Sequence, residues 1–209
     1  SGYAGAGGSG GGRLGAGSGS TPTLMGTAPD DDRFVVITDG QELMHLVLMW
    51  RDDVPAGWQP VREGADPRIA CEIPVTFGVE SADRSLSEQS VLVRGNSAVV
   101  VNNLQRLDPV VGQLPPQVAP YSQLLSGLPG NAPTGIERFS WDPETRTCDV
   151  VWSNPDVAIP NGIPTMSAAT SMIYGIGSRD GVWTLEGLDW DTGAEVLTVE
   201  TTAFPMPAA

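Results

Sequence analysis

The sequence predicts an all-β protein made of about three four-stranded antiparallel, propeller-like blades, which together form a partial β-propeller. The main reason is that three segments resemble one another, because internal repeats of short strands are typical of propellers. A β-rich run follows each segment after a short polar break, and successive copies begin 67 and 75 residues apart. The copies are residues 22–25, 89–92 and 164–167, and their β-rich runs are residues 34–37, 98–101 and 172–176.

The first blade is expected over residues 21–75, behind a glycine-rich segment. Residues 1–20 contain ten glycines, and we expect a flexible leader or a truncated loop there. Such a segment buries too little apolar surface to offset the entropy lost on ordering it. Residues 51–67 are polar, contain three prolines and are expected to form an inserted loop. The predicted strands are residues 21–25, 33–38, 43–50 and 68–75.

The second blade is expected over residues 87–152 and the third over residues 162–200, followed by an irregular tail at 202–209. Residues 104–133 form an insert in the second blade, and their six prolines exclude long helices and strands. The predicted strands are residues 89–94, 98–102, 135–141 and 148–152 in the second blade, and residues 162–167, 172–177, 183–190 and 195–200 in the third.

A turn in the third blade carries a resemblance to a known repeat. Residues 188–196 include Asp189, Thr192 and Gly193. They resemble the quinoprotein-type (PQQ-type) propeller repeat, in which an Asp-x-x-Thr-Gly turn joins the third and fourth strands. The motif that leads from residues 139–142 into Trp152 is similar but lacks the Thr-Gly pair.

More broadly, residues 18–39, 87–103 and 134–193 resemble bacterial quinoprotein-like β-propeller proteins of uncharacterised function. The resemblance implies a shape and not quinone chemistry. Members of that group are longer at both ends, which implies that this chain is a portion of a complete ring. Propellers close with 4–8 blades, so three blades leave two apolar end faces without neighbours. The expected partners are therefore the remaining blades or a second copy of the chain, and a fragment of a longer protein is the favoured explanation.

The two cysteines, Cys71 and Cys148, both fall on predicted outermost strands. Outer strands of neighbouring blades diverge, whereas a disulfide needs Cα atoms within about 7 Å of each other. A bond between these two cysteines therefore requires a displaced strand or a loop crossing. Each cysteine could instead pair with a cysteine elsewhere or remain a buried thiol, and these alternatives stay open.

The charge of the chain excludes two classes of partner. The sequence has 11 basic residues, all arginine, against 25 acidic residues, for a net charge of −14. Nucleic acids and anionic membrane surfaces both require clustered cations, so neither is an expected partner. No apolar run reaches the roughly 18 residues of a membrane-spanning helix. We expect a secreted or periplasmic location.

Four oxygen-bearing side chains are the candidate metal ligands. Asp39, Asn102 and Asn103 follow predicted second strands, and Glu88 precedes the inner strand of the second blade. Ca²⁺ takes 6–8 oxygen ligands, so a calcium site at the channel mouth is one hypothesis. The alternative is that these residues end strands and cap turns. The resemblance to calcium-dependent lactonase-type propellers is weakened because Gln89 stands where Asn is expected.

Three further residues stand out for their chemistry or their position in the chain. His45, the single histidine, alternates with apolar residues and is expected to be a half-buried structural side chain. Trp58 lies in a polar insert, where we expect an exposed ring that contacts a partner. Tyr121 lies in the 104–133 insert, which is the best candidate for a functional loop because long connections in compact domains are usually functional or disordered.

The sequence therefore favours a non-catalytic binding or assembly module of a secreted or periplasmic β-propeller. The first alternative is a calcium-dependent hydrolase or lactonase of propeller type. A weaker alternative is a quinone-dependent oxidoreductase, for which no basic or metal-bearing inner ring is visible. No catalytic residue is assigned, and Ca²⁺ is the one cofactor considered.

Overall fold

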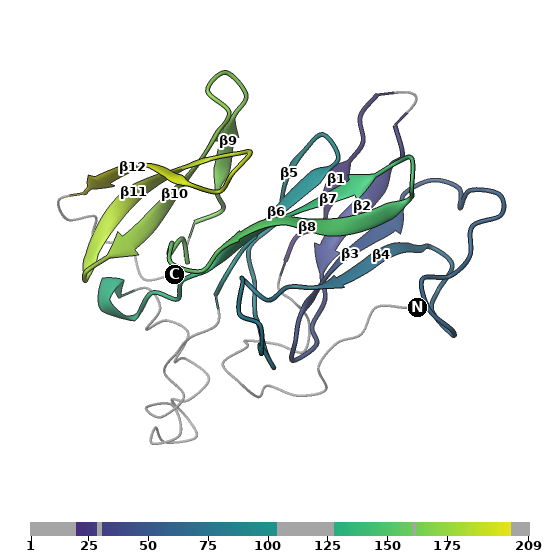
Figure 1. Cartoon of the computed structure of the whole chain (residues 1–209), viewed down its shortest axis with the longest axis horizontal. Helices are drawn as coiled ribbons and strands as arrows, with labels where there is room; N and C mark the ends of the chain where they lie inside the picture. Colours follow the sequence, from purple (N-terminus) through teal and green to yellow (C-terminus); the bar gives the residue numbers. More distant parts are fainter. Residues whose placement is uncertain (1–19, 29–30, 104–127, 161, 202–209) are drawn as a thin grey trace.

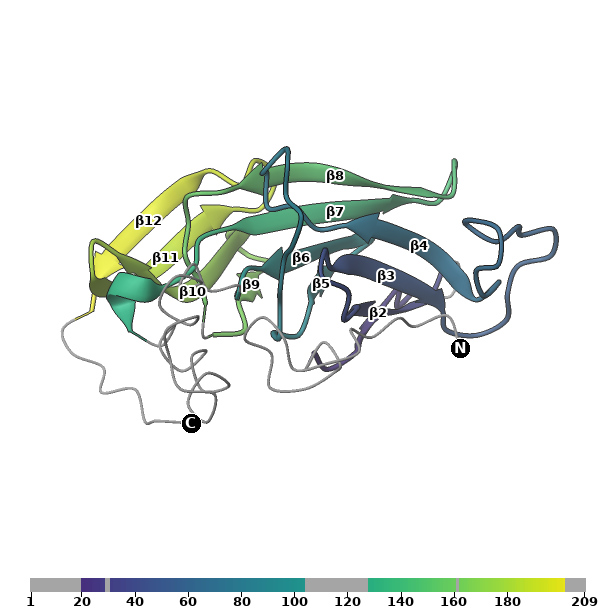
Figure 2. The same ribbon diagram turned by 90° about the horizontal axis from the view of Figure 1, so that it is seen from below.

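The computed structural model describes residues 20–28, 31–103, 128–160 and 162–201. Within these ranges the chain forms three four-stranded antiparallel sheets and one short 3-10 turn, η2 (Pro129–Asn131). The sheets follow one another along the molecule, and each uses consecutive strands (Figures 1 and 2). This arrangement confirms the predicted all-β class with three four-stranded, propeller-like sheets.

The strands of the first sheet are β1 (Thr23–Met25), β2 (Phe34–Thr38), β3 (His45–Trp50) and β4 (Ile69–Pro74). Those of the second are β5 (Leu92–Arg94), β6 (Ser97–Val101), β7 (Ile136–Asp142) and β8 (Thr147–Asn154). Those of the third are β9 (Thr165–Ser167), β10 (Met172–Arg179), β11 (Val182–Asp189) and β12 (Glu195–Glu200).

The turn between β11 and β12 has the geometry that its motif predicts. Asp189 Oδ1 accepts hydrogen bonds from the backbone N–H of Asp191 (3.1 Å) and Thr192 (2.8 Å) and from Thr192 Oγ1 (2.8 Å). Gly193 follows with φ +70°. The turn between β7 and β8 repeats this arrangement, because Thr145 Oγ1 donates to Asp142 Oδ2 and Arg146 takes the positive φ. The second turn therefore keeps its shape without glycine.

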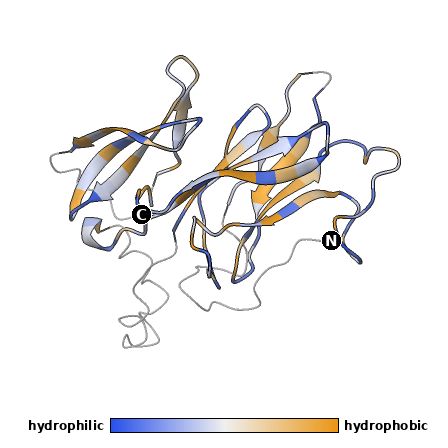
Figure 3. Ribbon diagram, viewed as in Figure 1, coloured by the Kyte–Doolittle hydropathy of each residue, from blue (hydrophilic) through white to orange (hydrophobic). Residues whose placement is uncertain are grey.

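The first and second sheets pack face to face around an aromatic core. Phe34 and Trp50 come from the first sheet, Trp141 comes from the second, and the ring centroids of Phe34 and Trp141 lie 4.9 Å apart. Figure 3 shows hydrophobic residues concentrated on the strands of these two sheets. Inner strand β1 contacts inner strand β5, and outer strand β4 contacts outer strand β8. The sheets therefore stack strand on strand, as neighbouring propeller blades do.

Cys71 on β4 and Cys148 on β8 form a disulfide, with Cα atoms 6.2 Å apart. The expectation that the outer strands diverge beyond bonding distance is therefore wrong for this pair of sheets. The physical reason is that β4 and β8 remain in contact, and Cys71 is buried in the core between the two sheets.

The second and third sheets pack through a smaller apolar core and a tryptophan contact. Trp152 Nε1 donates to the carbonyl oxygen of Trp190 at 2.9 Å. Gly193 lies so close to the Trp152 ring that an added Cβ would sit 2.5 Å from it. The guanidinium of Arg138 lies over the Trp190 ring, 4.6 Å from its centroid. The buried apolar residues of this core are Val99, Val101, Ile136, Val157, Ile159, Ile173, Leu188 and Trp190.

Candidate functional site

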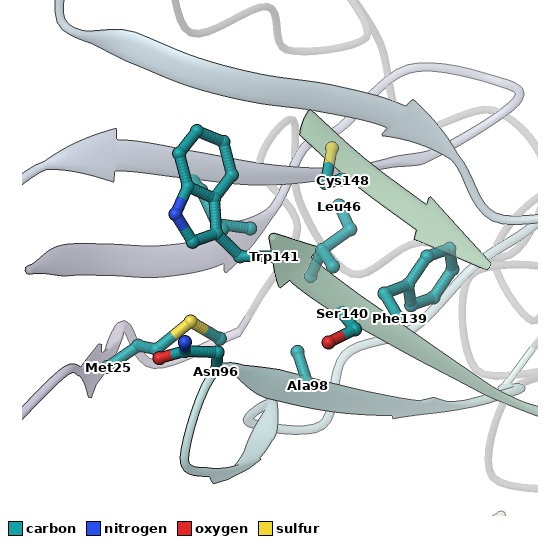
Figure 4. A pocket seen from close by; sticks show the side chains of 9 residues that line it. Met25, Leu46, Asn96, Ala98, Phe139, Ser140, Trp141 and Cys148 are labelled. Atoms are coloured by element: carbon teal, nitrogen blue, oxygen red, sulfur yellow. The ribbon is translucent and has the colours of Figure 1, made fainter. Parts of the chain in front are cut away.

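A hollow between the first two sheets is filled by side chains. Figure 4 shows Met25 and Leu46 of the first sheet facing Phe139 and Trp141 of the second. The space among them is too small for a water molecule. This region is therefore part of the core between the two sheets.

The structure brings together two of the four residues predicted to bind calcium. Asn103 follows β6 and Glu88 precedes β5, and the Glu88 backbone N–H donates to Asn103 Oδ1 at 2.8 Å. Asn103 Nδ2 in turn donates to the carbonyl oxygen of Pro160, which lies in the connection between the second and third sheets. Asn103 therefore ties the end of β6 to two inter-sheet connections.

Asn102 and the end of β2 make similar links. Asn102 Nδ2 donates to the carbonyl oxygen of Thr134 at 2.8 Å. Thr38 Oγ1 lies 3.5 Å from the carbonyl oxygen of Ser87, in the connection that enters the second sheet. These contacts fit the alternative that the residues end strands and cap turns. Calcium binding by Glu88, Asn102, Asn103 and Asp39 stays a prediction.

Asp39 belongs to a different cluster at the end of the first sheet, where its buried carboxylate accepts four hydrogen bonds. Oδ1 accepts from the backbone N–H of His45 (2.9 Å) and Gln41 (3.2 Å). Oδ2 lies 2.7 Å from Gln41 Nε2 and 3.1 Å from His45 Nδ1. The turn between β2 and β3 therefore folds around this carboxylate, and the side chain of Asp39 is only 2% exposed.

Glu72 on β4 completes the cluster. Ligand atoms of Asp39, His45 and Glu72 all lie within 4.8 Å of one another. Glu72 also binds Arg62, whose Nε and Nη2 atoms lie 2.9 Å and 3.1 Å from its two carboxylate oxygens. We call these residues, Asp39, His45 and Glu72 with Gln41 and Arg62 beside them, the β2–β4 polar cluster.

The cluster shifts two pKa values in opposite directions. The hydrogen bond to Asp39 raises the pKa of His45 above its ordinary value of 6.5, although burial acts the other way. Burial raises the pKa of Asp39, but hydrogen bonds from His45 and Gln41 outweigh it and leave the pKa below the ordinary 3.8. The pair therefore favours an imidazolium beside a carboxylate.

The sequence reasoning missed this cluster because it treated His45 alone. Both β3 and β4 were expected as neighbouring strands, and their pairing places His45 opposite Pro74 and Val47 opposite Glu72. His45 and Glu72 are thus diagonal neighbours, and that register was the signal that could have found the pair.

The environment of Trp58 differs from the exposed position that the sequence suggested. Its ring is half-buried and packs edge-on against Trp50, with centroids 5.3 Å apart, and also lies 6.3 Å from Trp141. The loop between β3 and β4 folds back onto the aromatic core, which is why the ring is covered. Partner binding by Trp58 stays a prediction, and Tyr121 lies outside the described residues.

The two end faces of the stack carry apolar side chains. In the first sheet Leu24, Val35 and Met49 lie in register across three strands. Their sequence neighbours Met25, Phe34 and Trp50 pack toward the second sheet. Successive side chains of a strand point to opposite faces, so Leu24, Val35 and Met49 point away from the second sheet. Leu24 is 56% exposed.

The third sheet has an equivalent row on its far side. Ile176, Leu185 and Val199 lie in register across β10, β11 and β12. Ile173 and Leu188 pack toward the second sheet, which turns the row of Ile176 away from it. Val199 is 46% exposed. Both ends of the stack therefore present apolar rows.

Comparison with known proteins gives one strong sequence match. No family model matches the chain. An uncharacterised protein from Archaeoglobus fulgidus is 53% identical over 195 residues, and the match covers 93% of this chain but 37% of that protein. Among solved structures, BamB from Moraxella catarrhalis is similar with a TM-score of 0.42 and 16% identity, over 90% of this chain and 40% of that chain. The chain thus spans less than half the length of both proteins.

Among the described residues, no helix is long and apolar enough to span a membrane.

Proposed function

We propose that this chain is a three-blade arc of a longer β-propeller and acts as a non-catalytic binding or assembly module. The observation that carries the proposal is the pair of outward apolar rows, Leu24 with Val35 and Met49, and Ile176 with Leu185 and Val199. Apolar rows of this kind are stabilised when another sheet covers them. We infer that the covering elements are further four-stranded sheets of the same polypeptide.

The length of the curated relative supports this choice of neighbour. Since 195 residues make up 37% of the Archaeoglobus protein, roughly 330 of its residues lie outside the match. Strands β1, β5 and β9 begin 69 and 73 residues apart. The remainder therefore has room for about four or five more sheets of this size, and seven or eight in all fall within the range of 4–8 that closes a propeller.

The disulfide supports the proposed secreted or periplasmic location, because disulfides form and persist mainly in oxidising compartments. The proposed partner contacts are Trp58 and the 104–133 insert with Tyr121. Deleting residues 110–128 should leave the fold intact and abolish partner binding. An unchanged set of partners after the deletion would contradict this role for the insert.

Light scattering on the purified chain tests the arc proposal. We expect self-association that grows with concentration, because the end faces cover one another when no further blades are present. Val199→Lys should reduce the association, since it places a charge in an apolar row. Val61→Lys, in the loop between β3 and β4, is the matched control and should not reduce it. A compact monomer of 21.9 kDa at all concentrations would count against the proposal.

The calcium-dependent hydrolase remains the second candidate, because Asn103 Oδ1, one of the proposed ligand atoms, lies beside the backbone of Glu88. A complete calcium site should raise the melting temperature through mass action. The absence of any shift in millimolar calcium would remove this candidate.

A further inference from the structure

We infer that Asp39, His45 and Glu72 form a binding site for one divalent transition-metal ion of the zinc class. The site lies at the end of the first sheet, with one ligand from the turn after β2, one from β3 and one from β4. The proposed metal site does not depend on the proposed role as a propeller arc. Light scattering tests the arc, and zinc titration tests the metal site.

The geometry of the donor atoms is the first support. Zinc sits about 2.0–2.2 Å from nitrogen and oxygen ligands, so ligand atoms around it lie roughly 3–4 Å apart. His45 Nδ1 and Asp39 Oδ2 already lie 3.1 Å apart. Ligand atoms of Asp39, His45 and Glu72 all lie within 4.8 Å of one another. A small inward movement of Glu72 would therefore complete a three-ligand site.

Gln41 offers a fourth ligand. Its Nε2 lies 2.7 Å from Asp39 Oδ2 and 3.3 Å from His45 Nδ1. An imidazole nitrogen cannot donate to the carboxylate and accept from the amide at the same time. Without a metal ion, Nε2 donates to Asp39 Oδ2; turning the amide by 180° when an ion binds would place Oε1 at this position instead. The nitrogen of His45 then faces oxygen atoms from Asp39 and Gln41.

Charge balance is the second support. The side chains of Asp39 and Glu72 are 2% and 10% exposed, so two carboxylates are held close together with little solvent. Burying like charges costs free energy unless cations compensate them. Without a metal ion, Arg62 compensates Glu72 from a side chain that is 56% exposed, and the protonated His45 ring compensates Asp39. A divalent ion that displaces the His45 proton supplies both positive charges from within the cluster and leaves Arg62 free to move into solvent.

The ligand set also indicates which metal fits. Ca²⁺ prefers 6–8 oxygen ligands, whereas an imidazole nitrogen favours zinc and its first-row neighbours. His45 is the single histidine in the chain, and the two cysteines are bonded to each other. Competing soft ligands are therefore few, and the imidazole is 22% exposed, which gives the ion a path in.

The test is titration of the purified chain with Zn²⁺ by calorimetry, with the lone imidazole followed by NMR. We expect one equivalent to bind and the His45 ring signals to shift with it. His45→Gln and Glu72→Gln should each weaken binding by about tenfold or more, because changing even an outer-shell partner of a ligand typically costs about 10–100-fold in affinity. Glu80→Gln, an exposed carboxylate in the connection after β4, is the matched control and should change nothing.

Arg62→Gln gives the sharpest distinction. Removing a competing cation from Glu72 should strengthen zinc binding, and a variant that gains affinity is not explained by loss of folding. Thermal melts of all variants report whether the fold survives. Binding that is insensitive to His45→Gln, an imidazole signal that does not move in millimolar zinc, or weaker binding in Arg62→Gln would each overturn the inference.

Discussion

Cys71 on β4 and Cys148 on β8 bond the outer strands of two neighbouring sheets, with their Cα atoms 6.2 Å apart. The bond closes a loop between positions 77 residues apart in the chain, which includes the 104–133 insert. A crosslink across so long a loop restricts the unfolded chain strongly. The first two sheets are therefore joined covalently at their outer edge and by the aromatic core further in.

Replacing both cysteines with serine should lower the free energy of unfolding by roughly 2–4 kcal/mol, because the unfolded chain regains the loop entropy. Denaturant unfolding of the double variant against the parent measures the change. Reducing agent should shift the unfolding midpoint of the parent toward that of the variant. It should leave the midpoint of the variant unchanged. Equal unfolding midpoints with and without reductant would show that the bond contributes nothing.

Gly193→Ala should destabilise the contact between the second and third sheets. The residue has φ +70°, and an added Cβ would lie 2.5 Å from the Trp152 ring. Gly95→Ala is the matched control, since Gly95 also has positive φ (+56°) but meets nothing within 4 Å. We expect Gly95→Ala to lower the free energy of unfolding by about 1 kcal/mol through backbone strain, and Gly193→Ala to lower it by clearly more. Thermal melts of the two variants and the parent measure the difference. Equal decreases in melting temperature would contradict the role of the Trp152 contact.

Glu137 should be a stabilising buried carboxylate. Its Oε2 accepts the backbone N–H groups of Thr76 and Phe77, each at 2.9 Å, and Oε1 accepts from Ser153 Oγ at 2.7 Å. Phe77 has φ 53°, which is unusual for a bulky residue, so these bonds hold a strained connection. Glu137→Ala leaves two backbone donors unsatisfied and should cost roughly 2–4 kcal/mol.

Denaturant unfolding measures the loss of stability in Glu137→Ala. Glu137→Gln, measured in the same way, separates hydrogen bonding from packing. The amide oxygen can still accept both N–H groups, and the amide nitrogen can donate to Ser153. We therefore expect Glu137→Gln to retain most of the stability that Glu137→Ala loses. If Glu137→Gln were as unstable as Glu137→Ala, the hydrogen bonds to the N–H groups of Thr76 and Phe77 would not be the source of the stability that Glu137 contributes.

The Asp39–His45 pair predicts a pH dependence of stability. Because the pKa of His45 is raised in the folded state, its contribution is complete below about pH 6.5 and is lost as pH rises through the folded value. Because the pKa of Asp39 is lowered, its contribution is present above about pH 3.8 and is lost as pH falls through the folded value. The pair therefore stabilises the fold most between these two limits.

Denaturant unfolding across this pH range, with a chelator present to exclude metal, measures the effect. His45→Gln removes the titrating ring, so the stability difference between parent and variant should be largest near pH 5 and shrink above neutrality. Glu72 and Arg62 also face the ring and are present in both proteins. A difference that stays constant with pH would show that the ring acts only through packing.

The strands and the turns of Asp142 and Asp189 could be predicted from the sequence because their signals are local. Short apolar runs mark the strands, and an aspartate followed three residues later by threonine marks the turn between β11 and β12. The expected strand at residues 89–94 is longer than the observed strand β5, which begins at Leu92. Strand ends depend on partners that the local sequence does not specify.

The disulfide, the position of Trp58 and the meeting of His45 with Glu72 were not predicted, because each depends on how distant segments approach. The distance between Cys71 and Cys148 follows from the angle between two sheets. The environment of Trp58 follows from the path of the loop between β3 and β4. The contact of His45 with Glu72 follows from the register of β3 against β4, where a shift by one residue would separate them.

A structure of the natural gene product is the measurement that tests the arc most directly. We predict that further four-stranded sheets cover the row of Leu24, Val35 and Met49 and the row of Ile176, Leu185 and Val199, and that the sheets close into a ring. A natural protein in which both rows remain exposed to solvent would contradict the partial propeller.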